Sequence, residues 1–166
     1  RITTVELNIE TITMNAKNIL ITILISLSFC ACNHNTLYSH FLPVSPIGWQ
    51  QDSVLTYTFP VHDTLNHYDV IICVRHMETY PYQNMWLFCA CGLDSLKHDT
   101  IEFFLADDRG KWLGNGSNQY VEMPVLYEQN ILFPDTGLYN FTIQHGMRDE
   151  RLKGVSDIGL IIRQSN

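Results

Sequence analysis

The chain has 166 residues, with 10 Lys and Arg against 17 Asp and Glu, and a formal net charge of −7. An acidic chain without a basic run is not expected to bind nucleic acid, nor to seek anionic lipid headgroups through its charge. Its length predicts one domain with one core.

Residues 14–31 have the anatomy of a secretory signal peptide. Met14 opens a short polar stretch with one cation, Lys17, and Ile19–Phe29 is an apolar run that is short for a membrane span. We therefore expect translation to start at Met14, which leaves residues 1–13 as upstream translation outside the fold. The alternative is an extended n-region with a late cleavage site.

The apolar run ends at Cys32, which we predict to be the lipidated residue of a lipoprotein. Two small residues, Cys30 and Ala31, precede Cys32, as a lipoprotein signal peptidase requires, whereas the large Phe29 precedes Cys30. Each buried CH₂ of an acyl chain contributes about 0.8 kcal/mol, so a fully acylated Cys32 is an effectively permanent anchor. The expected location is the cell envelope, at the outer membrane.

The remainder of the chain has a β-rich pattern. Residues 33–48 are polar, aperiodic and proline-bearing, which predicts a tether over 32–48. The runs at 68–75 and 85–91 are dense in apolar residues and are expected to be buried. We predict an all-β fold for 49–166, an antiparallel β-sandwich with Greek-key or jelly-roll-like connections. Its strands are expected at residues 54–59, 68–75, 85–91, 100–106, 120–127, 138–144 and 158–163.

Two local signals add detail to this prediction. Residues 107–110 (DDRG) predict a hairpin turn. Asp135, Gly137 and Tyr139 alternate at the start of a strand, the spacing of a tyrosine corner in which the hydroxyl bonds to upstream backbone. Phe141 then takes the inward place that a cysteine has in immunoglobulin domains. The alternative is an ordinary turn before a strand.

Three cysteines follow Cys32, so at least one of them is expected to be unpaired. Cys89 and Cys91 lie two apart in a strand-like run, where a direct bridge between them would be strained. We expect small core hydrophobes. The alternative is a disulfide that joins Cys73 to one of the other two.

Motifs of catalysis are not found in the sequence. The histidines are scattered, with no H-x-x-x-H pair and no G-x-S-x-G elbow. Residues 114–117 (GNGS) lack the lysine of a phosphate loop and are expected to form a hairpin turn. Asp107 and Asp108 lack the D-x-D-x-D alternation of a calcium loop. We assign no catalytic residue, metal or cofactor, although carboxylate pairs distant in sequence stay open.

Aromatic residues at turns are the remaining candidates for a site. Tyr80, Tyr82 and Trp112 are predicted to form a surface that binds a sugar or a protein. The alternative is that these rings cover the ends of the sandwich.

A repeated tripeptide, Asp followed by Ser or Thr and an aliphatic residue, resembles an O-glycosylation acceptor pattern of exported bacterial proteins. Asp-Ser and Asp-Thr are also favoured turn dipeptides at the start of a strand. Turns are accessible to modifying enzymes, so the two interpretations are compatible. We predict at least one glycan among Ser53, Thr64, Ser95 and Thr100.

Several stretches resemble the GldH family of gliding-motility lipoproteins. They are RHMETYPYQNM at 75–85, DRGKWLGNG at 108–116, GLYNF at 137–141, QHGMR at 144–148 and LKGVSDIGL at 152–160. The resemblance implies a non-enzymatic envelope lipoprotein that acts with other Gld proteins in gliding or in the linked secretion apparatus. It transfers one site residue, Cys32. The cysteines within 85–91 depart from the aliphatic residues expected there.

The resemblance names neither the protein partner nor the leaflet that holds the lipid, and it does not imply that the source organism glides. A glycan-binding surface lipoprotein that uses the turn aromatics is the second hypothesis. An enzyme is the third. A concave groove lined by aromatics favours a glycan, whereas a flat apolar patch favours a protein partner.

Overall fold

A computed structural model describes residues 36–93, 97–117 and 119–165. These residues form strands and contain no helix. No helix that could cross a bilayer is therefore present among them. The strands are β1 (Thr36–Pro43), β2 (Trp49–Gln50), β3 (Leu55–Val61), β4 (Tyr68–Met77), β5 (Asn84–Gly92), β6 (Lys97–Phe104), β7 (Asn115–Ser117), β8 (Tyr120–Ile131), β9 (Gly137–His145), β10 (Arg151–Leu152) and β11 (Val155–Gln164).

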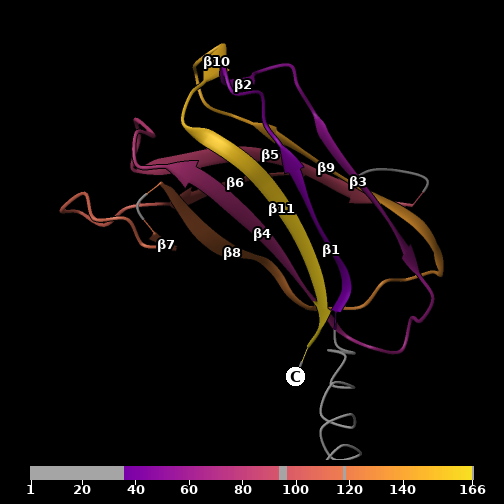
Figure 1. Ribbon diagram of the computed structural model, residues 1–166. Helices are drawn as coiled ribbons and strands as arrows, with labels where there is room; N and C mark the ends of the chain where they lie inside the picture. Colours follow the sequence, from indigo (N-terminus) through magenta and orange to yellow (C-terminus); the bar gives the residue numbers. More distant parts are fainter. Residues whose placement is uncertain (1–35, 94–96, 118, 166) are drawn as a thin grey trace, which may run out of the picture. The chain divides into compact units, whose positions relative to one another are not determined.

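Two antiparallel sheets pack as a sandwich, which confirms the predicted fold class (Figure 1). One sheet has the order β1-β11-β4-β8-β7 and the other has the order β3-β9-β5-β6. A small β10-β2 pair lies at one end. Each predicted run corresponds to a strand, from β3 to β11.

The core lies between the two sheets because alternate residues of each strand point inward. In β3 the inward residues are Tyr57, Phe59 and Val61, each no more than 1% exposed. Those of β11 in the opposite sheet include Ile158, whose carbonyl oxygen accepts a hydrogen bond from the Tyr57 hydroxyl at 2.7 Å. This bond connects the two sheets through the core.

The tyrosine corner is confirmed. The Tyr139 hydroxyl donates to the carbonyl oxygen of Asp135 at 3.1 Å, and the Asp135 N–H lies 3.4 Å from the same hydroxyl. Phe141 is 1% exposed, so it takes the predicted inward place. The turn at 107–110 is also confirmed, since the Gly110 N–H donates to the carbonyl oxygen of Asp107 at 2.9 Å.

Part of the predicted tether belongs to the sandwich. The sequence predicts a tether over 32–48, whereas Thr36–Pro43 is strand β1, an edge strand paired with β11. Its residues are exposed or half-buried, so no apolar alternation reveals the strand in the sequence. The pairing is specified by the partner strand: the Phe41 ring packs over Gly159 and lies 3.8 Å from the Arg75 guanidinium carbon.

The second difference concerns the apolar run at 85–91. The sequence predicts a buried run, whereas Trp86 and Phe88 are 39% and 45% exposed. Met85 and Leu87 point into the core and are fully buried. Because both faces of β5 carry apolar side chains, the alternation is invisible in a hydropathy pattern.

We call the end of the sandwich where β1 begins the proximal end, and the opposite end the distal end. The proximal end contains the β3–β4 loop (62–67) and the β8–β9 loop (132–136), because Val61 pairs with Gly137 and Tyr68 pairs with Ile131. β11 ends there too, with Thr36 paired to Arg163. In Figure 1 this end lies near the label C, and β2 and β10 mark the distal end.

Candidate interaction surfaces

The three predicted aromatics meet at the distal end, where Tyr80 and Trp112 pack against His76 and Tyr82 packs against Tyr80. The Tyr80 ring centroid lies 5.9 Å from that of Tyr82 and 6.4 Å from that of Trp112. The His76 ring lies 4.5 Å from Trp112. Tyr80 is only 3% exposed and Trp112 is half-buried, so the predicted exposure is wrong for Tyr80. Two of the three rings therefore cover the end of the sandwich, and Tyr82 is the exposed one.

Exposed aromatics that sequence reasoning missed lie beside Tyr82, on the outer face of the four-stranded sheet. Phe104 on β6 pairs with Asn84, which places it diagonal to Trp86 on the same face. Phe104 is 57% exposed. We call Tyr82, Trp86, Phe88 and Phe104 the aromatic patch. The alternation of side chains along β5 was the sequence signal that could have found these exposed aromatics. Once Met85 and Leu87 face inward, Trp86 and Phe88 must face outward.

A shallow pocket of about 430 Å³ opens beside the patch, lined by Tyr82, Asn84, Trp86, Gly146, Met147 and Arg148. Polar groups surround it. The Asn84 amide donates to Glu102 at 2.6 Å, and the Tyr82 hydroxyl donates to Asp149 at 2.7 Å. This bond to Asp149 is the main cause that raises the pKa of Tyr82. The pocket thus combines a ring face with hydrogen-bonding groups.

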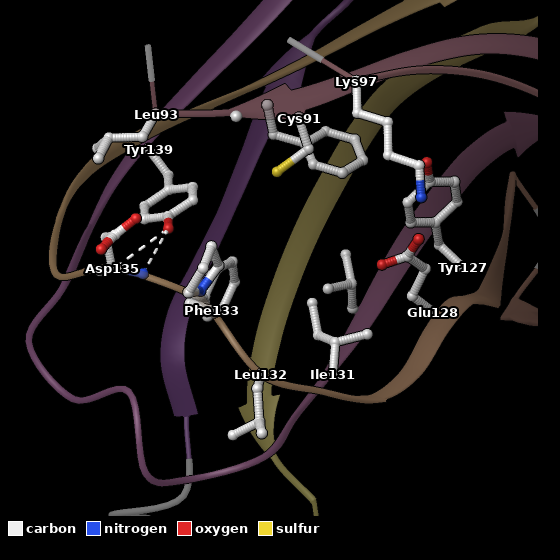
Figure 2. Close-up of a pocket in the computed structure, with 14 residues that line it drawn as sticks. Cys91, Leu93, Lys97, Tyr127, Glu128, Ile131, Leu132, Phe133, Asp135 and Tyr139 are labelled. Atoms are coloured by element: carbon white, nitrogen blue, oxygen red, sulfur yellow. Dashed lines mark hydrogen bonds between the residues drawn. The ribbon is translucent and has the colours of Figure 1, made fainter. Parts of the chain in front are cut away.

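A larger pocket of about 610 Å³ lies between the two sheets at the proximal end (Figure 2). Its apolar walls include Ile131, Leu132 and Phe133, and Lys97 and Glu128 supply charged groups. Figure 2 shows Cys91 between the side chains of Tyr139 and Tyr127. The volume lies within the range of small-molecule sites.

The three described cysteines are buried or half-buried. Cys73, Cys89 and Cys91 are all free in the structure. Cys89 packs in the core between the sheets, whereas Cys73 lies between Ile72 and Val74, which point into that core, and so faces away from it. The alternative of a disulfide is therefore wrong. Burial raises the pKa of Cys73 and Cys91 to about 11 and that of Cys89 to about 12. The thiols stay protonated at neutral pH, so they are poor nucleophiles and behave as core hydrophobes.

Two buried histidines lie at the distal end. The His76 Nδ1 donates to the Met77 carbonyl oxygen at 3.0 Å, and the His145 Nε2 donates to that of Trp49 at 3.1 Å. The other ring nitrogen of each is buried without a partner among the described residues. Burial lowers the pKa of both histidines, so both are neutral at neutral pH. No three His, Cys, Asp or Glu side chains form a metal site in the part of the chain that the structure describes.

The sites predicted for covalent modification are only partly described. Cys32 and Ser95 lie outside the described residues. Ser53 is exposed in a turn after β2, and Thr64 is half-buried in the β3–β4 loop. Thr100 is exposed within β6, opposite Phe88, and so lies beside the aromatic patch rather than in a turn.

In two of the segments that carry the family resemblance, a glycine stands where the neighbouring backbone leaves no room for a Cβ. Gly154 has φ +82°, and a Cβ there would come within 2.7 Å of the Tyr80 Cα. Gly116 pairs with Val121 so closely that a Cβ would collide with the Tyr120 carbonyl oxygen. The hairpin turn predicted at 114–117 includes strand β7 (Asn115–Ser117), which pairs with β8.

Comparison with known proteins then decides the family. The family model described as GldH lipoprotein matches residues 36–162. The chain belongs to the GldH lipoprotein family. Gliding motility lipoprotein GldH of Flavobacterium johnsoniae is 28% identical over 162 residues, which cover 92% of this chain and 100% of that protein. A GldH homolog of Christiangramia forsetii is 27% identical over 161 residues, with 92% and 98% covered.

Solved structures give weaker likenesses to this GldH family member. Dimeric latent PorU from Porphyromonas gingivalis aligns with a TM-score of 0.36 and 9% identity, over 79% of this chain and 13% of that one. An exo-β-1,3-galactanase from Phanerochaete chrysosporium aligns with a TM-score of 0.34 and 13% identity, over 77% and 26%. Both scores are too low to carry an argument.

Proposed function

We propose that the chain is a non-enzymatic, lipid-anchored component of the gliding-motility machinery, or of the secretion machinery linked to it. Cys32 carries the lipid, the outer membrane holds it, and the aromatic patch binds another envelope protein. The family match over residues 36–162 carries this proposal, together with two curated relatives named as gliding motility lipoproteins.

The chemistry of the described residues supports a non-enzymatic role. The thiols have raised pKa values and the two buried histidines are neutral, so these groups are not poised for nucleophilic or acid–base catalysis at neutral pH. The large pocket is lined mainly by apolar and aromatic side chains, with Lys97 and Glu128 as charged groups, and its thiol, Cys91, has a raised pKa.

The aromatic patch supports a protein partner. Aromatic residues are enriched in the cores of protein interfaces, where they lose the most water-exposed area at a low entropic cost. Trp86 and Phe88 stand on a regular strand, and the Phe88 ring lies against Gly146, 3.0 Å from where a Cβ would be. Their positions are thus fixed before binding, which reduces the entropy lost on association.

The test compares two variants in the native envelope. Trp86→Ser with Phe88→Ser should abolish the crosslinked complex and the surface spreading or secretion that the wild type supports in a deletion strain. Leu126→Ser, on the outer face of the other sheet and 50% exposed, is the matched control and should retain both. Normal spreading and secretion in the deletion strain itself would reject the proposed role in this machinery.

A glycan ligand is the second candidate, and the pocket of about 430 Å³ favours it. A sugar ring stacks on an aromatic face while its hydroxyls bond to planar polar side chains, and Trp86, Asn84 and Arg148 offer both. Titration of purified protein with envelope polysaccharide separates the two candidates. Saturable binding that Arg148→Ala weakens would support the glycan, and unchanged heats would reject it.

A further inference from the structure

Three leucines are exposed at the proximal end of the sandwich. Leu65 is 86% exposed in the β3–β4 loop, Leu132 is 50% exposed in the β8–β9 loop, and Leu138 is 59% exposed at the start of β9. The two loops leave the sheets side by side, because Val61 and Gly137 are paired. Exposed aliphatic residues also lie at the distal end, so what distinguishes these leucines is their place on neighbouring loops at the end where β1 begins.

The β3–β4 loop is shaped so that Leu65 points outward. The Asp63 carboxylate accepts hydrogen bonds from the Leu65 N–H at 2.7 Å and from the Asn66 amide. Asn66 in turn accepts a bond from Gln164 at 2.8 Å, and the His67 carbonyl oxygen accepts one from the Ser165 N–H at 2.9 Å. The charge of Asp63 is therefore bonded back to its own loop, which is fastened to the end of β11, and Leu65 is left at the tip.

The same end is where the chain enters the domain. Thr36 begins β1 there, and Cys32 lies four positions earlier. Four residues span at most about 14 Å when fully extended, so an acyl anchor on Cys32 cannot hold the domain far from the bilayer. A lipid surface then lies within reach of the two loops.

We infer that the proximal end is a membrane-contact surface, in which Leu65, Leu132 and Leu138 enter the interfacial region of the bilayer that holds the acyl chains. The inference rests on the proposed lipidation of Cys32. Aliphatic loop residues suit this occupant, since the acidic chain has no basic cluster to attract headgroups and only apolar contact is available. The surface fixes the orientation of the domain, with the aromatic patch on the side away from the lipid.

The membrane contact at Leu65 and a glycan on the neighbouring Thr64 exclude each other. Thr64 directly precedes Leu65, and a glycan there would place a bulky hydrophilic group at the membrane contact. If the proximal end meets lipid, the glycans belong to the other three acceptors.

Quenching by lipid tests the inference with full-length lipidated protein in phosphatidylethanolamine vesicles that carry brominated acyl chains. Leu65→Trp and Leu132→Trp place a fluorophore at the proposed contact without disturbing the core. Leu113→Trp is the matched control, because Leu113 lies at the distal end and is also 50% exposed. Bromine quenches only at contact range, so the added emission should be lost in the first two variants and retained in the control.

The outcomes separate this inference from the proposed anchor. Flotation with the vesicles, measured on the same samples, reports whether the lipid holds the protein. Floating protein whose added emission is unquenched in both proximal variants would overturn the membrane contact and leave the anchor standing. A blue-shifted but unquenched emission would assign the leucines to a second copy of the chain and also overturn it. Wild-type protein that fails to float would overturn the anchor, and the inference with it.

Discussion

The two ends of the sandwich differ in whether they expose aromatic side chains. The proximal end carries exposed leucines, two of them in loops, whereas the distal half carries exposed aromatic rings beside the aliphatic Ile47, Val54 and Leu113. Aliphatic side chains on loops suit contact with a fluid phase such as lipid, which has no fixed shape to match. Rings held on a sheet offer fixed shape, which a protein or a sugar can recognise. In our account the proximal end therefore attaches the domain to the membrane, and the distal half presents a binding surface to a partner.

The largest expected effect is the loss of membrane attachment. Cys32→Ser should abolish incorporation of labelled fatty acid and release the protein from the membrane fraction, because acyl burial supplies the anchor. Cys30→Ser is the control and should leave both unchanged. Labelling that persists in Cys32→Ser and disappears in Cys30→Ser would move the anchor by two residues.

The tyrosine corner makes the fold at the proximal end testable on its own. Tyr139→Phe leaves the part-buried carbonyl oxygen of Asp135 without its partner and should lower the free energy of unfolding by about 0.5–1.5 kcal/mol. Tyr82→Phe also removes a hydroxyl, but on the exposed distal side, and should cost less than about 0.5 kcal/mol. Equal melting curves for the two variants would show that the corner contributes nothing.

Acid should weaken the distal end. His76 and His145 have pKa values below the ordinary 6.5, so the unfolded chain binds more protons than the folded one once the pH falls below that value. Their contribution to stability is complete above pH 6.5 and declines as the pH falls toward the folded pKa. We expect the melting temperature to fall in this window, and less steeply in His76→Gln. A wild-type slope in that variant would contradict the role of His76.

The smallest expected effect is a difference in mass. Protein purified from its native envelope should exceed the mass of the lipidated polypeptide by sugar-sized increments, and alanine at Ser53, Thr64, Ser95 and Thr100 should remove the excess. A variant changed at Thr64 alone sharpens the comparison of the ends, since the membrane contact predicts no change there. A native mass equal to the lipidated polypeptide would end the glycosylation proposal.

Much of the fold was predictable because most strands show an alternation or a turn signal that needs no tertiary context. The tyrosine corner is one such local signal, in which three residues specify the turn and the phase of β9. β1 was missed because an edge strand with no buried face has no pattern of its own, and its pairing with β11 supplies the missing specification. Local sequence signals therefore predict most strands, whereas the edge strand β1 depends on its pairing with β11, which is far away in the sequence.

The candidate surfaces were less predictable than the fold. Tyr80 stands in a proline-containing turn that indicates exposure, yet the packing of His76 and Trp112 against it covers the ring. Trp86 and Phe88 lie in a run that indicates burial, yet nothing in the described part of the chain covers the outer face of β5. In both cases the side chain's surroundings come from strands far apart in sequence, which no single-sequence pattern contains.

Site-specific photocrosslinking in the native envelope tests the central claim most directly. A photoreactive phenylalanine analogue replaces Trp86 in one strain and Leu65 in another, and both proteins keep the lipid anchor. Our account predicts that the analogue at Trp86 gives a discrete protein adduct of higher mass, whereas the analogue at Leu65 gives a lipid adduct. A protein adduct at Leu65 together with none at Trp86 would reverse the two ends and contradict the account.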